Sequence, residues 1–295
     1  MNSINQNNYT PSFCAYYKSS FSRRLEKTLL TGQGSQQLED EFVRILQTKK
    51  NNRAKMGTPG MYGSVYRLDD YYVFKTYHVD KELGTHPFKK VLDERFQGFK
   101  TYVGNVLAKF GKIEVIANAT RDKRKFVELA RASKQGSEAY TKSLREFASL
   151  PQKQFDMLAQ DFSRLNGICD GNINYKFDTH NPNNFLKIGS SLKLVDEIAI
   201  TPCKEPNDIH AFLRAFIQES GDSDIKKAVF KKCILASEKE KLPMDDAHKY
   251  MSTYMEEIFK NAGVNDTFEN FYKLMTEYRN DKNHMRLVEQ YLENI

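Results

Sequence analysis

The sequence of 295 residues contains no long apolar run, and its first residues do not combine basic side chains with an apolar stretch. A helix that crosses a bilayer needs about eighteen or more consecutive apolar residues, and an export peptide needs a basic start followed by an apolar stretch. We therefore expect no membrane span and a cytoplasmic protein.

Cysteine is scarce and charge of one sign is not concentrated. The four cysteines lie far apart and form no C-x-x-C pair, which argues against a zinc ribbon or a dithiol redox motif and favours reduced thiols. Lysine and arginine number 45 against 38 aspartates and glutamates, a net charge of +7. This excess is too diffuse to indicate a nucleic-acid partner, so we expect none.

The first part of the chain changes character near residue 35. Residues 1–34 are polar and rich in Asn, Ser and Gln, which predicts a mobile segment. Starts of this composition also occur on effectors that bacteria inject into host cells, so secretion into a host cell is the alternative localisation. From Ser35 a helix is expected, because Leu38, Phe42 and Ile45 fall on one face.

A glycine-containing turn leads into two expected strands, 64–68 and 71–77. Gly60 and Gly63 lack a Cβ atom, so backbone N–H groups there could approach phosphate oxygens. Lys75 follows twelve residues after Gly63, inside an apolar run. An ammonium group at such a position suggests an anionic partner.

A long helix is expected over residues 88–110, where apolar side chains recur at three- and four-residue steps. Glu94 lies in this stretch, nineteen residues after Lys75, and could face that lysine; Glu82 is the alternative. Strands are expected at 113–117 and 125–129, with residues 126–130 connecting two lobes.

Three polar residues further on have a spacing suited to metal-bound nucleotide. Asn183 lies five residues after Asp178, and Asp196 thirteen residues after Asn183. Two carboxylates and an amide on neighbouring loops can hold Mg²⁺-bound ATP and orient an acceptor hydroxyl. A short hairpin, 185–188 with 192–195, would bring Asp196 back toward Asn183.

Taken in order, these elements resemble the protein-kinase-like superfamily from about Met56 to Pro202. Gly60, Gly63 and Val65 match the glycine-rich loop of that family from its second glycine onward. The resemblance implies an α+β, bilobal protein-kinase-like fold, with a small β-rich N-lobe and a helical C-lobe. The expected division is a mobile segment 1–34, an N-terminal helix and N-lobe over 35–130, and a C-lobe over 131–295.

The resemblance also implies ATP and Mg²⁺ as cofactors and gives roles to single residues. Asp178 would orient the acceptor hydroxyl, His180 would touch the transferred phosphoryl group, and Asn183 and Asp196 would hold the metal. Lys75 would contact the α- and β-phosphates. The remaining expected nucleotide-binding residues are Gly60, Gly63, Val65, Val73 and Glu94.

Departures from the family pattern leave the acceptor open. Phe177 stands where an arginine is usual, Glu197 and Ile198 replace the Phe and Gly of D-F-G, and no A-P-E signature is present. The first interpretation is a serine/threonine protein kinase. The alternatives are a small-molecule kinase of the aminoglycoside or choline kinase type, which His180 favours, and a pseudokinase scaffold; adenylylation and glutamylation also stay open.

Helices are expected in the second half of the chain. Residues 152–165 carry Phe155, Leu158, Phe162 and Leu165 on one stripe, which predicts a core helix. Further helices are expected from apolar side chains at helical spacing over residues 208–220, 224–239, 244–262 and 268–292.

Overall fold

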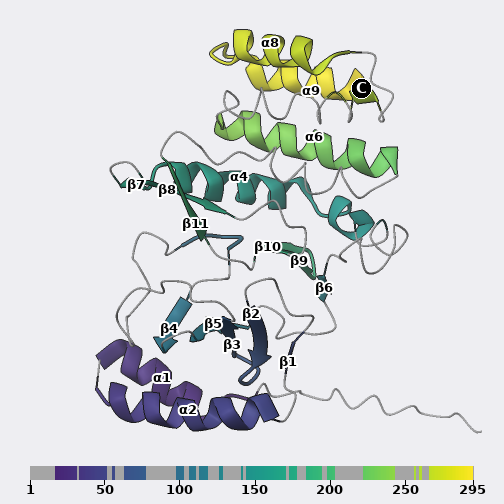
Figure 1. The fold of residues 1–295 in the computed structure, drawn as a ribbon. Coiled ribbons are helices and arrows are strands. Elements are labelled where there is room, and N and C mark those ends of the chain that lie inside the picture. The colour runs from purple at the N-terminus through teal and green to yellow at the C-terminus, as the bar shows by residue number, and fades with distance from the viewer. Residues whose placement is uncertain are drawn as a thin grey trace, which may run out of the picture. The chain divides into compact units, whose positions relative to one another are not determined.

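The computed structural model describes residues 17–31, 33–51, 55–56, 63–77, 98–102, 106–110, 113–118, 126–128, 141, 144–170, 173–177, 184–194, 198–202, 222–242, 256, 259–260 and 266–294. The described residues form helices and small antiparallel sheets, which agrees with the expected α+β class (Figure 1). The chain divides into two compact units: unit 1 comprises residues 1–91 and 106–121, and unit 2 comprises residues 92–105 and 122–295.

Unit 1 is built on an antiparallel sheet of five strands in the order β1-β2-β3-β5-β4, in which β3 is central. The expected hairpin is confirmed, since β2 pairs with β3 from Gly63↔Tyr77 to Arg67↔Val73. The strands are β1 (Lys55–Met56), β2 (Gly63–Arg67), β3 (Tyr72–Tyr77), β4 (Val106–Phe110) and β5 (Ile113–Ala117).

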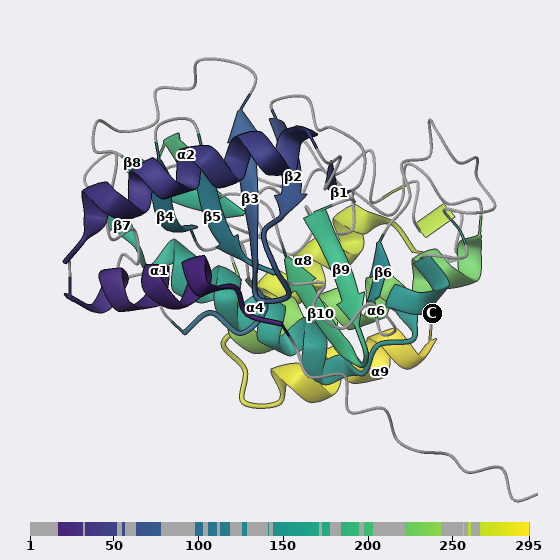
Figure 2. The ribbon, with the colours of Figure 1, turned by 90° about the horizontal axis from the view of Figure 1, so that it is seen from below.

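Two helices, α1 (Ser20–Thr31) and α2 (Ser35–Asn51), run along one side of this sheet (Figures 1 and 2). Their apolar stripes bury Phe21 and Phe42 against Phe74 of β3. The Phe42 ring stacks on Phe21 with centroids 5.2 Å apart and meets Phe74 edge-on at 5.7 Å. Because Phe74 points toward the helices, its neighbours Val73 and Lys75 point to the opposite face of the sheet.

Unit 2 contains two small antiparallel sheets. The first, in the order β10-β9-β6, joins β6 (Phe126–Glu128), β9 (Phe185–Ile188) and β10 (Ser191–Leu194). The hairpin β9–β10 is confirmed as predicted, and Gly189 in its turn has φ 63°, a conformation that glycine adopts without strain. The second, in the order β11-β8-β7, joins β7 (Cys169–Asp170), β8 (Ile173–Phe177) and β11 (Ile198–Pro202).

The described helices of unit 2 pack in layers, with α4 (Gln152–Asn166) against α6 (Ser223–Glu240) and α6 against α9 (His284–Asn294) (Figure 1). α8 (Phe268–Tyr278) packs against α9. The predicted stripe of α4 is confirmed as core, since its four members are at most 1% exposed. Side chains cap the N-termini of α6 and α8. The Asp222 carboxylate accepts from the backbone N–H of Asp224 and Ile225 at the start of α6, and the Thr267 hydroxyl accepts from that of Asn270 at the start of α8.

Two predictions are wrong for residues that the structure describes. The segment 1–34 was expected to be mobile, but Ser20–Thr31 form α1, in which Phe21 and Leu25 are buried. The helix expected over 88–110 does not include Val106–Phe110, which form β4. Only Gly111 and Lys112 separate β4 from β5, so pairing with the neighbouring strand overrides the helical spacing of its apolar residues.

Two further predictions, on residues of unit 2, need correction. Phe126–Glu128 form a strand, as expected, but this strand pairs with β9 rather than joining the five-stranded sheet. The single helix expected over 268–292 is two helices, separated at Arg279–Asn283. The Asp281 side chain accepts from the backbone N–H of Asn283 at 2.6 Å, a local bond that competes with helix continuation. The helix expected over 224–239 is confirmed as α6, whereas 208–220 and most of 244–262 lie outside the described residues.

Candidate functional site

Lys75 lies at the middle of β3, the central strand of unit 1. It is the register partner of Val65 on β2, and Val73 lies two residues before it on the same strand. Side chains two residues apart on a strand, and side chains directly opposite on neighbouring strands, share a face. The structure therefore brings Val65, Val73 and Lys75 together on the sheet face that α1 and α2 do not cover.

Gly63 is the first residue of β2, and the chain from residue 57 to 62, which includes Gly60, connects β1 to β2. These strands pair antiparallel, with Met56 opposite Val65. The expected glycine-containing segment thus joins two neighbouring strands directly before the strand that carries Lys75.

The register brings a buried acid to this face that the sequence reasoning did not predict. Glu114 on β5 is the register partner of Lys75 and is 5% exposed. Its neighbour Val115 belongs to the core on the α1–α2 side, so Glu114 projects from the same face as Lys75. A single glutamate among Ile113, Val115 and Ile116 was the available signal.

In unit 2, two pairs of strands bring together the chain positions that flank the expected catalytic loop. Phe177, the last residue of β8, is the register partner of Ile198, the first residue of β11. Phe185, the first residue of β9, is the register partner of Leu194, the last residue of β10. Asp178 follows Phe177 by one residue, and Asp196 precedes Ile198 by two. The end of β8 before Asp178 therefore lies beside the start of β11 after Asp196, and the start of β9 lies beside the end of β10.

Six predicted site residues lie outside the described residues, namely Gly60, Glu94, Asp178, His180, Asn183 and Asp196. Asn184, which follows Asn183 in the sequence, directly precedes β9 and is 5% exposed. Within the described ranges, no group of three or more His, Cys, Asp or Glu side chains is arranged to hold a metal ion.

Phe177 is fixed by an aromatic cluster. It is 1% exposed, and its ring centroid lies 5.6 Å from that of Phe99, 5.4 Å from that of Tyr102 and 5.3 Å from that of Phe162. An arginine at this position would be buried in apolar surroundings. The packing at Phe177 therefore disfavours an arginine at this position, and the residue before Asp178 is held rigidly.

The segment 98–102 lies beside β10 and is bonded to Asp161 of α4. The Asp161 carboxylate, 2% exposed, accepts from the backbone N–H of Lys100 at 3.0 Å and from that of Thr101 at 2.6 Å. It also accepts from the Thr101 hydroxyl at 2.5 Å. The Thr101 carbonyl accepts from the backbone N–H of Leu194 at 2.9 Å, so one segment connects α4 to the strand that leads to Asp196.

Lys193 adds a second tie to this segment. Its ammonium donates to the Lys100 carbonyl at 2.6 Å. Burial lowers the pKa of Lys193, and the nearby Asp161 carboxylate opposes that shift. The last residues of β10 are thus held by both main-chain and side-chain bonds.

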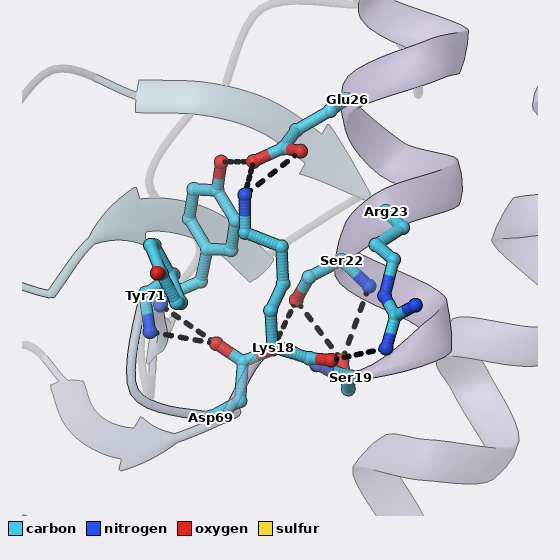
Figure 3. A network of polar contacts seen from close by, with 8 residues as sticks. Lys18, Ser19, Ser22, Arg23, Glu26, Asp69 and Tyr71 are labelled. Atoms are coloured by element: carbon cyan, nitrogen blue, oxygen red, sulfur yellow. Dashed lines mark hydrogen bonds and ion pairs between the residues drawn. The ribbon is translucent and has the colours of Figure 1, made fainter. Parts of the chain in front are cut away.

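In unit 1, a polar network fixes the turn between β2 and β3 against the start of α1 (Figure 3). One Asp69 oxygen accepts from the hydroxyls of Ser19 and Ser22, and the other accepts from the backbone N–H of Tyr71 at 2.8 Å and of Tyr72 at 3.0 Å. Burial alone would raise the pKa of Asp69, but these hydrogen bonds outweigh it and lower the pKa. Sequence reasoning identified the turn but not this role for Asp69.

Glu26 extends the same network along α1. Its carboxylate accepts from the Lys18 ammonium at 2.7 Å and from the Tyr72 hydroxyl (Figure 3). Burial raises the pKa of Tyr72, and the Glu26 carboxylate raises it further. The strand that carries Lys75 is therefore anchored to α1 at its first residue.

Comparison with known proteins gives no family. The sequence matches no protein-family model and no curated protein. Among the helices that the structure describes, none combines the length and apolar character needed to span a bilayer.

Proposed function

We propose that the chain is an ATP- and Mg²⁺-dependent phosphotransferase with a bilobal protein-kinase-like fold, and that it acts on serine or threonine hydroxyls of a protein. The observation that carries this proposal is the pair of registers in unit 2, Phe177↔Ile198 and Phe185↔Leu194. Directly opposed residues in antiparallel strands have Cα atoms roughly 4.5–5.5 Å apart, and each further residue adds at most about 3.8 Å. These limits support a site in which Asp178, Asn183 and Asp196 act together.

The position of Lys75 supports the same proposal independently. In protein kinases the phosphate-contacting lysine is carried on the third strand, after the glycine-rich loop. Lys75 lies on β3, after the segment that contains Gly60 and Gly63, and it shares a face with Val65 and Val73. These neighbours suit the apolar surface that an adenine ring requires.

The proposed roles follow from the charge that moves in the reaction. The γ-phosphoryl group passes from ATP to the acceptor oxygen, the bond to the β-phosphate breaks, and ADP leaves. Asp178 accepts the hydroxyl proton and Lys75 holds the α- and β-phosphates, and Asn183 and Asp196 would hold Mg²⁺. When bound, Mg²⁺ would neutralise charge on the β- and γ-phosphates.

The test is intact-mass analysis of the full-length protein and of a mixed protein substrate after incubation with Mg²⁺ and ATP. We expect phosphate on protein with the wild type and none with Asp196→Ala. The matched control is Asp224→Ala, which removes an exposed aspartate of α6 and should keep full activity. Phosphate transfer by Asp196→Ala at the wild-type rate would overturn the metal assignment.

Other outcomes identify the alternatives. In a parallel incubation with labelled ATP and a metabolite mixture, label that appears only on small molecules would indicate an acceptor of the aminoglycoside or choline type. A protein mass increased by an adenylate would indicate nucleotidyl transfer. Binding of Mg²⁺-ATP without turnover would indicate a pseudokinase scaffold. Absence of both binding and turnover would reject the proposal as a whole.

A further inference from the structure

The sheet of unit 1 places an acid opposite the proposed phosphate-binding lysine. Glu114 on β5 and Lys75 on β3 are register partners, and Val65 on β2 is the partner of Lys75 on the other side. Directly opposed side chains in an antiparallel pair have Cβ atoms roughly 4.5–5.5 Å apart. A lysine and a glutamate so placed can bring ammonium and carboxylate into contact.

Burial makes this arrangement more than a surface pair. Glu114 is 5% exposed, while its neighbours Ile116 and Val115 are 8% and 0% exposed. A buried carboxylate is costly unless a cation or hydrogen-bond donors compensate it. The register offers two cationic positions opposite Glu114, Lys75 on β3 and Lys109 on β4.

We infer that Glu114 is the positioning residue for Lys75, holding its ammonium group in the orientation that contacts the nucleotide phosphates. This inference rests on the proposed function and replaces Glu94, the acid expected from the sequence. Both members of the pair are carried on adjacent strands of one sheet, so strand register sets their separation. The orientation of the lysine then requires no movement of a helix, and activity does not depend on a switch at this pair.

The experiment compares kcat/KM for Mg²⁺-ATP in variants of the full-length protein. Glu114→Gln keeps the side-chain shape and removes the charge. We expect a loss of roughly 10- to 100-fold, because a hydrogen bond to a charged group contributes about 1.5–3 kcal/mol. The fold-loss of kcat/KM in Glu94→Gln should be at least ten times smaller than that in Glu114→Gln. Asp40→Asn, an exposed acid of α2, is the neutral control.

Double variants separate positioning from sheet stability. If Glu114 acts through Lys75, Lys75→Met/Glu114→Gln should be no slower than Lys75→Met alone. Lys109→Met/Glu114→Gln should still show the full effect of Glu114→Gln. The conservative Glu114→Asp should recover part of the lost kcat/KM, whereas a purely structural role of Glu114 would leave kcat/KM of the folded fraction unchanged in both Glu114→Gln and Glu114→Asp.

The outcomes that overturn the inference are distinct from failure of the proposed function. Full kcat/KM in Glu114→Gln, or additive losses in Lys75→Met/Glu114→Gln, rejects the role of Glu114 while leaving the phosphotransferase standing. If Glu114→Gln does not fold, Glu94→Gln and Glu114→Asp are compared, provided that both unfold at the wild-type midpoint. A greater loss of kcat/KM in Glu94→Gln than in Glu114→Asp then also rejects the role of Glu114. A wild type that neither binds nor turns over Mg²⁺-ATP rejects the proposed function itself.

Discussion

Asp161 of α4 accepts hydrogen bonds from both the backbone N–H and the hydroxyl of Thr101, at 2.6 and 2.5 Å. The two residues are separated by 60 positions, and both are buried, with Asp161 2% and Thr101 0% exposed. Through Thr101 the carboxylate also supports Leu194, whose backbone N–H donates to the Thr101 carbonyl. This relationship fixes the segment that lies beside the last residue of β10.

We predict that Asp161→Asn lowers the free energy of unfolding by about 3 kcal/mol, because an amide nitrogen would face donors that now meet a charged acceptor. Urea denaturation measures the loss. Asp156→Asn on the same helix is the control, since its ion pair with the exposed Lys239 should contribute at most about 1 kcal/mol. Equal losses in the two variants would contradict the role of Asp161.

Phe177 gives a second prediction, on the residue that differs from the kinase pattern. Phe177→Leu should cost less than about 1.5 kcal/mol, because it keeps the site apolar and nearly filled. Phe177→Arg, which introduces the arginine of the protein-kinase pattern, should destabilise unit 2 by several kcal/mol, because the guanidinium would be buried among Phe99, Tyr102 and Phe162.

The control for Phe177→Arg is Tyr278→Arg at a position that is 36% exposed, where a small effect is expected. Chemical denaturation of both variants decides. A Phe177→Arg protein as stable as the wild type would mean that the aromatic cluster can open to water.

The lowered pKa of Asp69 predicts how the free energy of unfolding of unit 1 changes in acid. Its folded-state pKa is lowered, so its contribution is complete above the unfolded pKa of about 3.9 and is lost as the pH falls through the folded value. We expect Asp69→Asn to lower the free energy of unfolding by about 1–3 kcal/mol at neutral pH. The gap from the wild type should shrink below pH 4.

Measuring unfolding free energy from pH 6 to pH 2 tests this directly, with Asp40→Asn as an exposed control. Other carboxylates, among them Glu26 and Asp222, also have lowered pKa values, so the wild type loses stability in acid from several sources. Only the difference between wild type and Asp69→Asn isolates Asp69. A difference that stays constant from pH 6 to pH 2 would contradict the ionised role.

Local patterns were sufficient for some elements and insufficient for others. The strand around Lys75 and the stripe of α4 were predictable, because alternation and helical spacing are properties of one segment. β4 and the sheet partner of β6 were not, because pairing with a distant or neighbouring strand decided them. The roles of Glu114 and Asp69 were not predictable for the same reason, since they depend on a residue of a neighbouring strand and on residues at the start of α1.

A buried charge network in unit 2 leads to the last prediction. The Glu238 side chain, at the end of α6, is fully buried; it lies 2.7 Å from His284 Nε2 and 3.5 Å from the Arg279 guanidinium. Arg279 also donates to the Leu242 carbonyl. The network therefore connects the end of α6 to the segment between α8 and α9.

Removing the Glu238 carboxylate takes the ionic partner from the Arg279 guanidinium and the hydrogen-bond partner from the buried His284, and breaking a buried ion pair costs about 3–5 kcal/mol. We expect Glu238→Ala to lose this amount in urea denaturation, against less than about 0.5 kcal/mol for the exposed Glu269→Ala on α8. Glu238→Ala/Arg279→Ala should lose less than the sum of the single variants, because the second change removes the cation that the first leaves unpaired. Strict additivity would mean that water reaches Arg279 once Glu238 is gone, and that the end of α6 opens more easily than its burial implies.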